Sequence, residues 1–284
     1  MRHKEFIMKL LIELIKAALF GIIEGVTEWL PISSTGHLII LERLVQMDVS
    51  DAFVEMFRVV IQLGAILAVV VMYFTRLNPF AKSKSPAEKS ATWQLWFKVI
   101  VAVIPSAVVG MLFDDWFDEH FYNYITVAIT LIIYGVAFIL IERRSPKSQV
   151  KSDVSSITYL TAFAIGLFQI LAIIPGTSRS GSTILGAMLL GLTRTAAAEF
   201  SFFMAIPTMV GASGLKAVKF ILDSGIPTYD ELLILLVGSV VAFVVSIIAI
   251  RFLLDFVRKH TFTSFGVYRI ILGAVVITYF LIAG

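Results

Sequence analysis

Long apolar stretches are the feature that most constrains how this chain can fold. A helix needs about 20 consecutive apolar residues to cross the hydrocarbon core of a bilayer. Six stretches are long enough, at roughly 54–75, 94–113, 121–141, 197–220, 232–257 and 264–283. Mean hydropathy is +0.93 and only 15% of residues are charged, against about a quarter in soluble proteins. The chain is therefore predicted to be an all-α polytopic membrane protein with six full transmembrane helices.

Two further apolar regions are interrupted by polar residues. The region 8–46 is broken from Pro31 to Gly36, and the region 158–191 is broken from Pro175 to Ser182. Non-helical backbone at membrane depth is tolerated only where protein or a water-filled cavity satisfies its polar groups. Each broken region is therefore predicted to be a re-entrant helix pair that dips into the membrane and returns.

The two broken regions match each other at one constant offset. The matched residues are Gly21 with Gly166, Ser33 with Ser178, and Gly36 with Gly181. Three spans follow each break, so residues 1–284 are predicted to form one domain of two repeats (about 8–142 and 158–284), the second inverted. Such repeats place their site near the midplane, where the repeats meet. We therefore expect Ser34 and Arg179 to lie within side-chain reach of each other.

Lysine and arginine gather in alternate loops. The basic loops hold Arg76, Lys82, Lys84, Lys89, Arg143, Arg144, Lys147 and Lys151, with further basic turns at Arg194 and at Arg251, Arg258 and Lys259. The turns at 114–120 and 222–231 contain acidic residues and no lysine or arginine. Because cytoplasmic loops are enriched in basic residues, the basic loops are predicted to lie inside and the acidic turns outside, with both termini outside.

The first break carries acids and hydroxyls where apolar residues are expected. Glu24 and Glu28 are four residues apart and share one helix face, and intramembrane carboxylates are candidates for function. Together they suit a divalent cation (Mg²⁺ or Ca²⁺) or a general base. A polar run follows, made of Ser33, Ser34, Thr35 and His37. One of its hydroxyls is expected to cap the next helix, but capping does not require the whole run.

The second break, "PGTSRSGST" at 175–183, places an arginine among hydroxyls and glycines. A helix start with free N–H groups, hydroxyl donors and an arginine fork makes an anion site, for which phosphate is the natural ligand. In the alternative interpretation, Arg179 is a structural cation neutralised by Glu28. The combination of hydroxyls, imidazole, carboxylates and a phosphate clamp at bilayer depth indicates phosphoryl chemistry on a lipid.

Four segments carry a resemblance to a known family: "EGVTEWLPISSTGH", "FRVVIQLGAILAVV", "PGTSRSGSTILGAMLLG" and "AAEFSFFMAIP". Across its whole length the chain resembles the undecaprenyl-pyrophosphate phosphatases of the bacitracin-resistance type. The resemblance implies a bacterial plasma-membrane (inner-membrane) enzyme that removes the terminal phosphate of undecaprenyl pyrophosphate and so recycles the lipid carrier for peptidoglycan synthesis. It also implies bacitracin resistance, a divalent cation, and a site that opens to the outer face.

The resemblance also assigns roles to individual residues. The acidic motif maps onto Glu24 and Glu28 as metal ligands, the serine–histidine motif onto Ser33, Ser34, Thr35 and His37, and the arginine motif onto Ser178, Arg179, Ser180 and Thr183. Ser34 is the expected nucleophile, Glu28 or His37 its base, and Arg179 the oxyanion clamp. The remaining hydroxyls are expected to bind phosphate. Gln62 is either a further phosphate contact or an interhelical hydrogen-bonding residue, and Arg58 beside it departs from the family pattern.

Other functions stay open at this stage. A transporter or flippase of a phosphorylated lipid carrier would share the repeats and the anion site but would not need Ser34 beside Glu28. A phosphatase of the phosphatidic-acid type would need a second histidine, and only His37 lies in a break. The expected partners are a polyprenyl pyrophosphate and the bilayer, with a possible homodimer and no nucleic acid.

Three polar residues outside the breaks receive structural interpretations. Glu199 and Ser201 are expected to cap and pack the start of their span. Arg269 is expected to extend along the last helix to the membrane surface, as long basic side chains near helix ends do.

Overall fold

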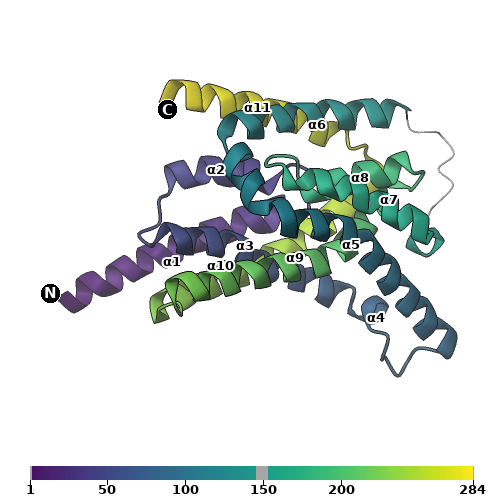
Figure 1. The fold of residues 1–284 in the computed structure, drawn as a ribbon, viewed down its shortest axis with the longest axis horizontal. Helices are drawn as coiled ribbons and strands as arrows, with labels where there is room; N and C mark the ends of the chain where they lie inside the picture. The colour runs from purple at the N-terminus through teal and green to yellow at the C-terminus, as the bar shows by residue number, and fades with distance from the viewer. Residues whose placement is uncertain (1, 145–152, 284) are drawn as a thin grey trace.

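The structure, a computed structural model, describes residues 2–144 and 153–283, and within these ranges it contains helices and no strand (Figure 1). The first half consists of α1 (Arg2–Thr27), α2 (Ser34–Leu44), α3 (Asp51–Met72), α4 (Phe74–Leu77), α5 (Pro86–Phe121) and α6 (Tyr124–Arg144). The second consists of η1 (Val154–Ser156), α7 (Tyr159–Ile170), η2 (Leu171–Ile173), α8 (Arg179–Leu189), α9 (Arg194–Ser224), α10 (Tyr229–Lys259) and α11 (Thr263–Ala283). Lys147 and Lys151 lie outside the described residues.

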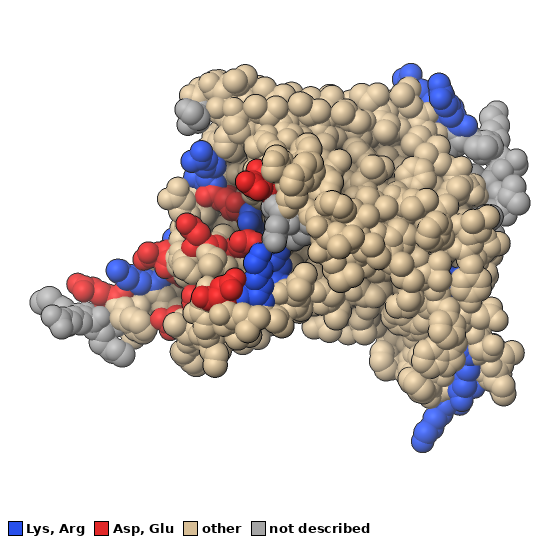
Figure 2. Space-filling model, viewed as in Figure 1, with Lys and Arg blue, Asp and Glu red and all other residues tan. Residues whose placement is uncertain are grey.

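The prediction of a multi-pass all-α membrane protein is confirmed. Six described helices (α3, α5, α6, α9, α10 and α11) are long and apolar enough to cross a membrane, and they correspond in order to the six predicted spans. Large apolar side chains such as Ile133, Leu236 and Ile248 point outward from these helices. Figure 2 shows charged side chains at the two ends of the molecule and a broad uncharged surface between them.

The first long helix of each half packs against a helix of the other half. Helix α1 of the first half packs along α10 of the second, and α7 packs in the equivalent way along α5. The matched glycines make both contacts close: a methyl group on Gly21 would overlap the carbonyl oxygen of Gly238, and one on Gly166 would overlap that of Ala102. Helices α6 and α11 pair with each other along the top of Figure 1, and α3 pairs with α9. The duplication itself stays a prediction.

The halves are not identical, and some sequence-based boundaries are wrong. Helix α1 has 26 residues, whereas α7 has 12. The predicted acidic turn at 114–120 is helical, because α5 continues to Phe121. Re-entrance, and the inverted orientation of the second half, stay predictions.

Helices α3 and α9 run antiparallel and are joined by an ion pair near each end. Nη1 of Arg76 lies 2.7 Å from Oε2 of Glu199, and Nζ of Lys216 lies 2.7 Å from Oε1 of Glu55. Glu199 therefore holds α9 to the segment after α3, instead of capping its own helix as expected from the sequence. The first turn of α9 is capped by Thr193, which accepts a hydrogen bond from the N–H of Ala196.

Candidate active site

Both breaks end in a serine that caps the next helix. Oγ of Ser33 accepts a hydrogen bond from the N–H of Gly36 at 3.3 Å, and Oγ of Ser178 accepts one from Gly181 at 3.2 Å. Both serines have a positive φ, 72° for Ser33 and 74° for Ser178, a region that side-chain-bearing residues rarely occupy. The two turns thus repeat the same strained geometry, and strain of this kind collects at functional sites.

Both breaks begin and end earlier in the chain than the sequence indicated. Helix α2 begins at Ser34 and helix α8 at Arg179, whereas the polar runs predicted breaks that continue to Gly36 and Ser182. The wrong boundary has a simple cause: Ser33 and Ser178 cap the helices, so the polar residues after them already lie in a first helical turn. Ser34 and Arg179 consequently sit at equivalent positions, each at the start of a helix.

Glu28 joins the two breaks. Its Oε1 accepts hydrogen bonds from Nε and Nη2 of Arg179 at 3.2 and 3.0 Å, and its Oε2 accepts one from Oγ of Ser34 at 3.3 Å. The carboxylate is buried, whereas Ser34 and Arg179 are half-buried. The structure therefore brings together the three residues on which the sequence analysis depended most. It also contains the Arg179–Glu28 contact that the structural-cation interpretation requires.

Arg179 also contacts a network of buried hydroxyl groups. Nη1 of Arg179 donates to the carbonyl oxygen of Ser201 at 2.9 Å, and the hydroxyl groups of Ser201 and Thr183 lie 2.7 Å apart. Oγ of Ser180 donates to the carbonyl oxygen of Glu28 at 3.1 Å. Phosphate binding by Ser180 and Thr183 stays a prediction, and both residues are buried together with Ser201. Ser180 joins the start of α8 to Glu28 and Thr183 contacts Ser201, whereas Ser201 is the one of the three that contacts the guanidinium. The sequence analysis missed this role of Ser201.

His37 lies beside the site but does not contact Ser34 through a hydrogen bond. Its Nδ1 lies 2.7 Å from the carbonyl oxygen of Ser33, and its Nε2 lies 2.7 Å from the hydroxyl of Tyr268 on α11. A carbonyl only accepts, so Nδ1 carries the proton, and Nε2 accepts from Tyr268. The His37 and Tyr268 rings also stack, with 5.7 Å between centroids. Both ring nitrogens are therefore engaged away from Ser34.

Glu24 is fully buried, and neither of its oxygens receives a hydrogen bond from a described residue. Its counterpart in the second half, Gln169, donates to hydroxyls of Ser106 and Thr208. A buried carboxylate without a donor requires a proton or a cation, so Glu24 fits a cation ligand. The described residues contain no cluster of three or more His, Cys, Asp or Glu, so a cation on Glu24 and Glu28 would need further oxygens from a phosphate ligand or water.

Arg269 contradicts its sequence interpretation. Its side chain is 0% exposed and points into the protein, where it donates to the carbonyl oxygens of Pro31 at 3.2 Å and of Gly176 and Thr177 at 2.9 Å. These carbonyls belong to the two breaks. An arginine within an otherwise apolar span was the signal that could have identified it, because intramembrane charges are usually functional.

The remaining predicted residues are less closely involved. Gln62 on α3 and Thr35 on α2 are half-buried. Within the described part of the chain, neither side chain forms a hydrogen bond with Glu28 or with the break before α8. Ser178 caps α8 and contacts Ser180. Arg58 pairs with Glu42 at 3.1 Å and also contacts Tyr122, so the change from the family pattern is neutralised locally.

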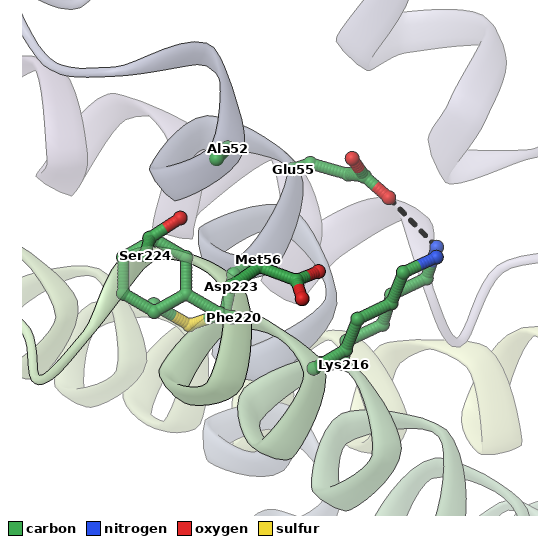
Figure 3. A pocket seen from close by; sticks show the side chains of 8 residues that line it. Ala52, Glu55, Met56, Lys216, Phe220, Asp223 and Ser224 are labelled. Carbon is green, nitrogen blue, oxygen red and sulfur yellow. Dashed lines mark hydrogen bonds and ion pairs between the residues drawn. The ribbon is translucent and has the colours of Figure 1, made fainter.

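A pocket lies elsewhere, between the start of α3 and the end of α9 (Figure 3). The Lys216–Glu55 ion pair crosses it. None of the residues in the two breaks lines it.

Comparison with known proteins gives a consistent result. Residues 17–275 match the family model described as bacitracin resistance protein BacA. Proteins named undecaprenyl-diphosphatase from Streptococcus pyogenes serotypes M3, M1 and M18 are each 56% identical to the chain over 271 residues, covering 95% of this chain and 97% of each relative.

Proposed function

Because the chain belongs to the bacitracin resistance protein BacA family, we propose that its two breaks form the active site of an undecaprenyl-diphosphatase. The protein hydrolyses undecaprenyl diphosphate to undecaprenyl phosphate and inorganic phosphate. This reaction recycles the lipid carrier for peptidoglycan synthesis and gives bacitracin resistance. The observation that carries the site assignment is Glu28, which contacts Ser34 through one oxygen and Arg179 through the other.

We assign Ser34 the role of the nucleophile. Its Oγ forms a bond to the terminal phosphorus, the bond from that phosphorus to the bridging oxygen breaks, and the electron pair leaves with undecaprenyl phosphate. The hydroxyl proton passes to Oε2 of Glu28, which already accepts it in a hydrogen bond. Water then hydrolyses the phosphoserine, which releases inorganic phosphate and restores Ser34.

Glu28 fits the role of base better than His37. The hydrogen bond from Ser34 ends on Glu28, whereas both nitrogens of His37 are occupied by Ser33 and Tyr268. We assign His37 to shaping the first break.

Arg179 and the start of α8 provide the phosphate clamp. Phosphoryl transfer depends on positioning and on stabilising charge over the equatorial oxygens. Arg179 is half-buried at a helix start, where N–H groups and the helix dipole also favour an anion. A terminal phosphate would take over the guanidinium from Glu28, which frees Glu28 to accept the proton of Ser34.

Glu24 and Glu28 would hold a divalent cation, which when bound neutralises charge on the diphosphate oxygens. The support for this assignment is the pair of unpartnered oxygens of buried Glu24. The cation is Mg²⁺ or Ca²⁺, both of which take oxygen ligands.

The protein spans a membrane several times, and we place it in the bacterial plasma membrane with its site open to the outer face. Support comes from the basic residues near the ends of α6 and α10, the end predicted to be cytoplasmic (Arg143, Arg144, Arg258 and Lys259). A homodimer stays a prediction.

The experiment is phosphate release by the purified protein from a polyprenyl diphosphate, with and without chelator. Phosphate release by the unchanged protein, and its loss in Arg179→Ala, supports the assignment of the active site. A preparation that binds the lipid but releases no phosphate would favour the carrier or flippase alternative.

A further inference from the structure

Arg269 is a buried cation held by carbonyl groups. Its guanidinium contacts the carbonyl oxygens of Pro31, Gly176 and Thr177, and among the described residues no carboxylate forms an ion pair with it. Its Cζ lies 5.4 Å from the centroid of the Tyr134 ring on α6. Burying an unpaired charge is expensive, so packing alone does not explain an arginine at this position.

The three carbonyls belong to two turns that are far apart in the chain. Pro31 precedes Ser33, and Gly176 and Thr177 precede Ser178. Gly176 has φ +86°, and the positive φ of each serine turns the chain sharply just before a helix. Nη1 contacts the first turn while Nη2 contacts the second. The planar guanidinium therefore sets the separation of the two turns.

The same guanidinium also lies next to the first turn of α8. A methyl group on Gly181 would lie 3.4 Å from its Nη1. The turns that it joins carry Ser34 and Arg179, which meet on Glu28. A change in the separation of the turns would therefore move Ser34 and Arg179 relative to each other, although both side chains would be chemically unchanged.

We infer that Arg269 is a positioning residue that clamps the two turns together, so that Ser34 and Arg179 reach the same phosphate. Its effect on turnover rests on the proposed function, whereas the clamp itself does not. A lysine keeps the charge but cannot reproduce the planar, two-pronged contact.

The experiment compares Arg269→Lys with Arg194→Lys. Arg194 is a matched control, because it also joins two helices through two hydrogen bonds, to Glu142, but lies outside the site. Two quantities are measured in each full-length variant: backbone hydrogen exchange in segments 28–37 and 174–183, and the kinetics of phosphate release.

The clamp predicts faster exchange in both segments of Arg269→Lys and in neither segment of the control. It also predicts that kcat falls by about 100-fold, as for a small misplacement of reacting groups, while KM stays close to that of the unchanged protein. Faster exchange in only one segment, or in none, overturns the inference, as does a kcat equal to that of the control. If the unchanged protein releases no phosphate, the proposed function fails. The hydrogen-exchange measurement then tests by itself whether Arg269 clamps the two turns.

A second pair of variants covers the case in which Arg269→Lys does not fold. Tyr134→Leu removes the ring beside the guanidinium, and Tyr134→Phe keeps the ring but removes the hydroxyl that accepts from Ser182. The clamp predicts faster exchange in both segments for Tyr134→Leu and less change for Tyr134→Phe. Equal exchange in the two variants would overturn it.

Discussion

Glu28 and Arg179 are 151 residues apart in the chain, yet Nη2 of Arg179 lies 3.0 Å from Oε1 of Glu28. Each comes from a different half, so neither half contains a complete site. Removing one partner of a buried ion pair typically destabilises a protein by about 3–5 kcal/mol. Substitutions at either position will therefore affect stability as well as chemistry, and the predictions below measure both.

Ser34→Ala should abolish turnover and leave lipid binding intact. Loss of a nucleophile lowers kcat by about 10³-fold or more, while Arg179 and the helix starts still bind the diphosphate. Phosphate release and lipid binding are measured on the same preparation. Substantial turnover by Ser34→Ala would show that water is the nucleophile and that Ser34 is a phosphate ligand.

Arg179→Lys should be nearly as damaging as Arg179→Ala, because a lysine cannot contact Ser201 and two oxygens of a phosphate at once. The loss of an arginine that stabilises the transferring phosphoryl group is expected to lower kcat by about 10³-fold. A thermal transition recorded for each variant separates this loss from unfolding. Near-normal kcat in Arg179→Lys would support the structural-cation interpretation instead.

Glu28→Gln should lower kcat far more than His37→Gln. A general base contributes about 10²–10⁴-fold, and the hydrogen bond of Ser34 ends on Glu28. Phosphate release by the two variants is measured side by side, together with a thermal transition for each. The reverse order would transfer the base role to His37.

Glu24→Gln should raise the cation concentration needed for half-maximal activity by about tenfold or more, as loss of a ligand or its support does. Glu55→Gln is the control, because Glu55 pairs with Lys216 outside the site. Titration with Mg²⁺ and Ca²⁺ after chelation measures the effect. Full hydrolysis by the unchanged protein in excess chelator would contradict the metal role of both acids.

Gly176→Ala should destabilise the protein. The φ of +86° alone makes alanine unfavourable by about 1–2 kcal/mol, and its methyl group would also lie 2.7 Å from the carbonyl oxygen of Val127. Gly211→Ala is the control, since a methyl group there meets nothing within 4 Å. Thermal unfolding in detergent should show a lower midpoint for Gly176→Ala only. Equal midpoints would mean that the turn can relax.

The sequence predicted the fold well wherever hydropathy was sufficient. Six spans and two polar breaks could be identified because the membrane requires long apolar helices and penalises polar backbone. The ends of the breaks could not be predicted, because the positive φ of Ser33 and Ser178 leaves no mark in composition. Helix α1 begins at Arg2, before the apolar region 8–46, and the two charged residues that interrupt its apolar run, Glu13 and Lys16, pair with each other.

The sequence predicted those site residues that lie within a single motif. It did not predict those that helix packing brings to the site from distant parts of the chain. Glu28 with Ser34 follows from one motif, and Arg179 from another. Tyr268 contacts His37 across 231 residues, and Arg269 reaches carbonyls that only the packed helices bring together. An arginine six residues into a helix has the same sequence context whether it extends to the surface or is buried.

The exchange of partners between the halves also determines when the enzyme can become active during its synthesis. Helix α1 packs mainly on α10, which the ribosome produces some 200 residues later. Until then the acids at the end of α1 are in the membrane without the second turn to cover them. Arg269 is supplied by α11, so the site forms only after α11 has been inserted. Nascent chains that stop before α11 are expected to be inactive and to be degraded by membrane quality control.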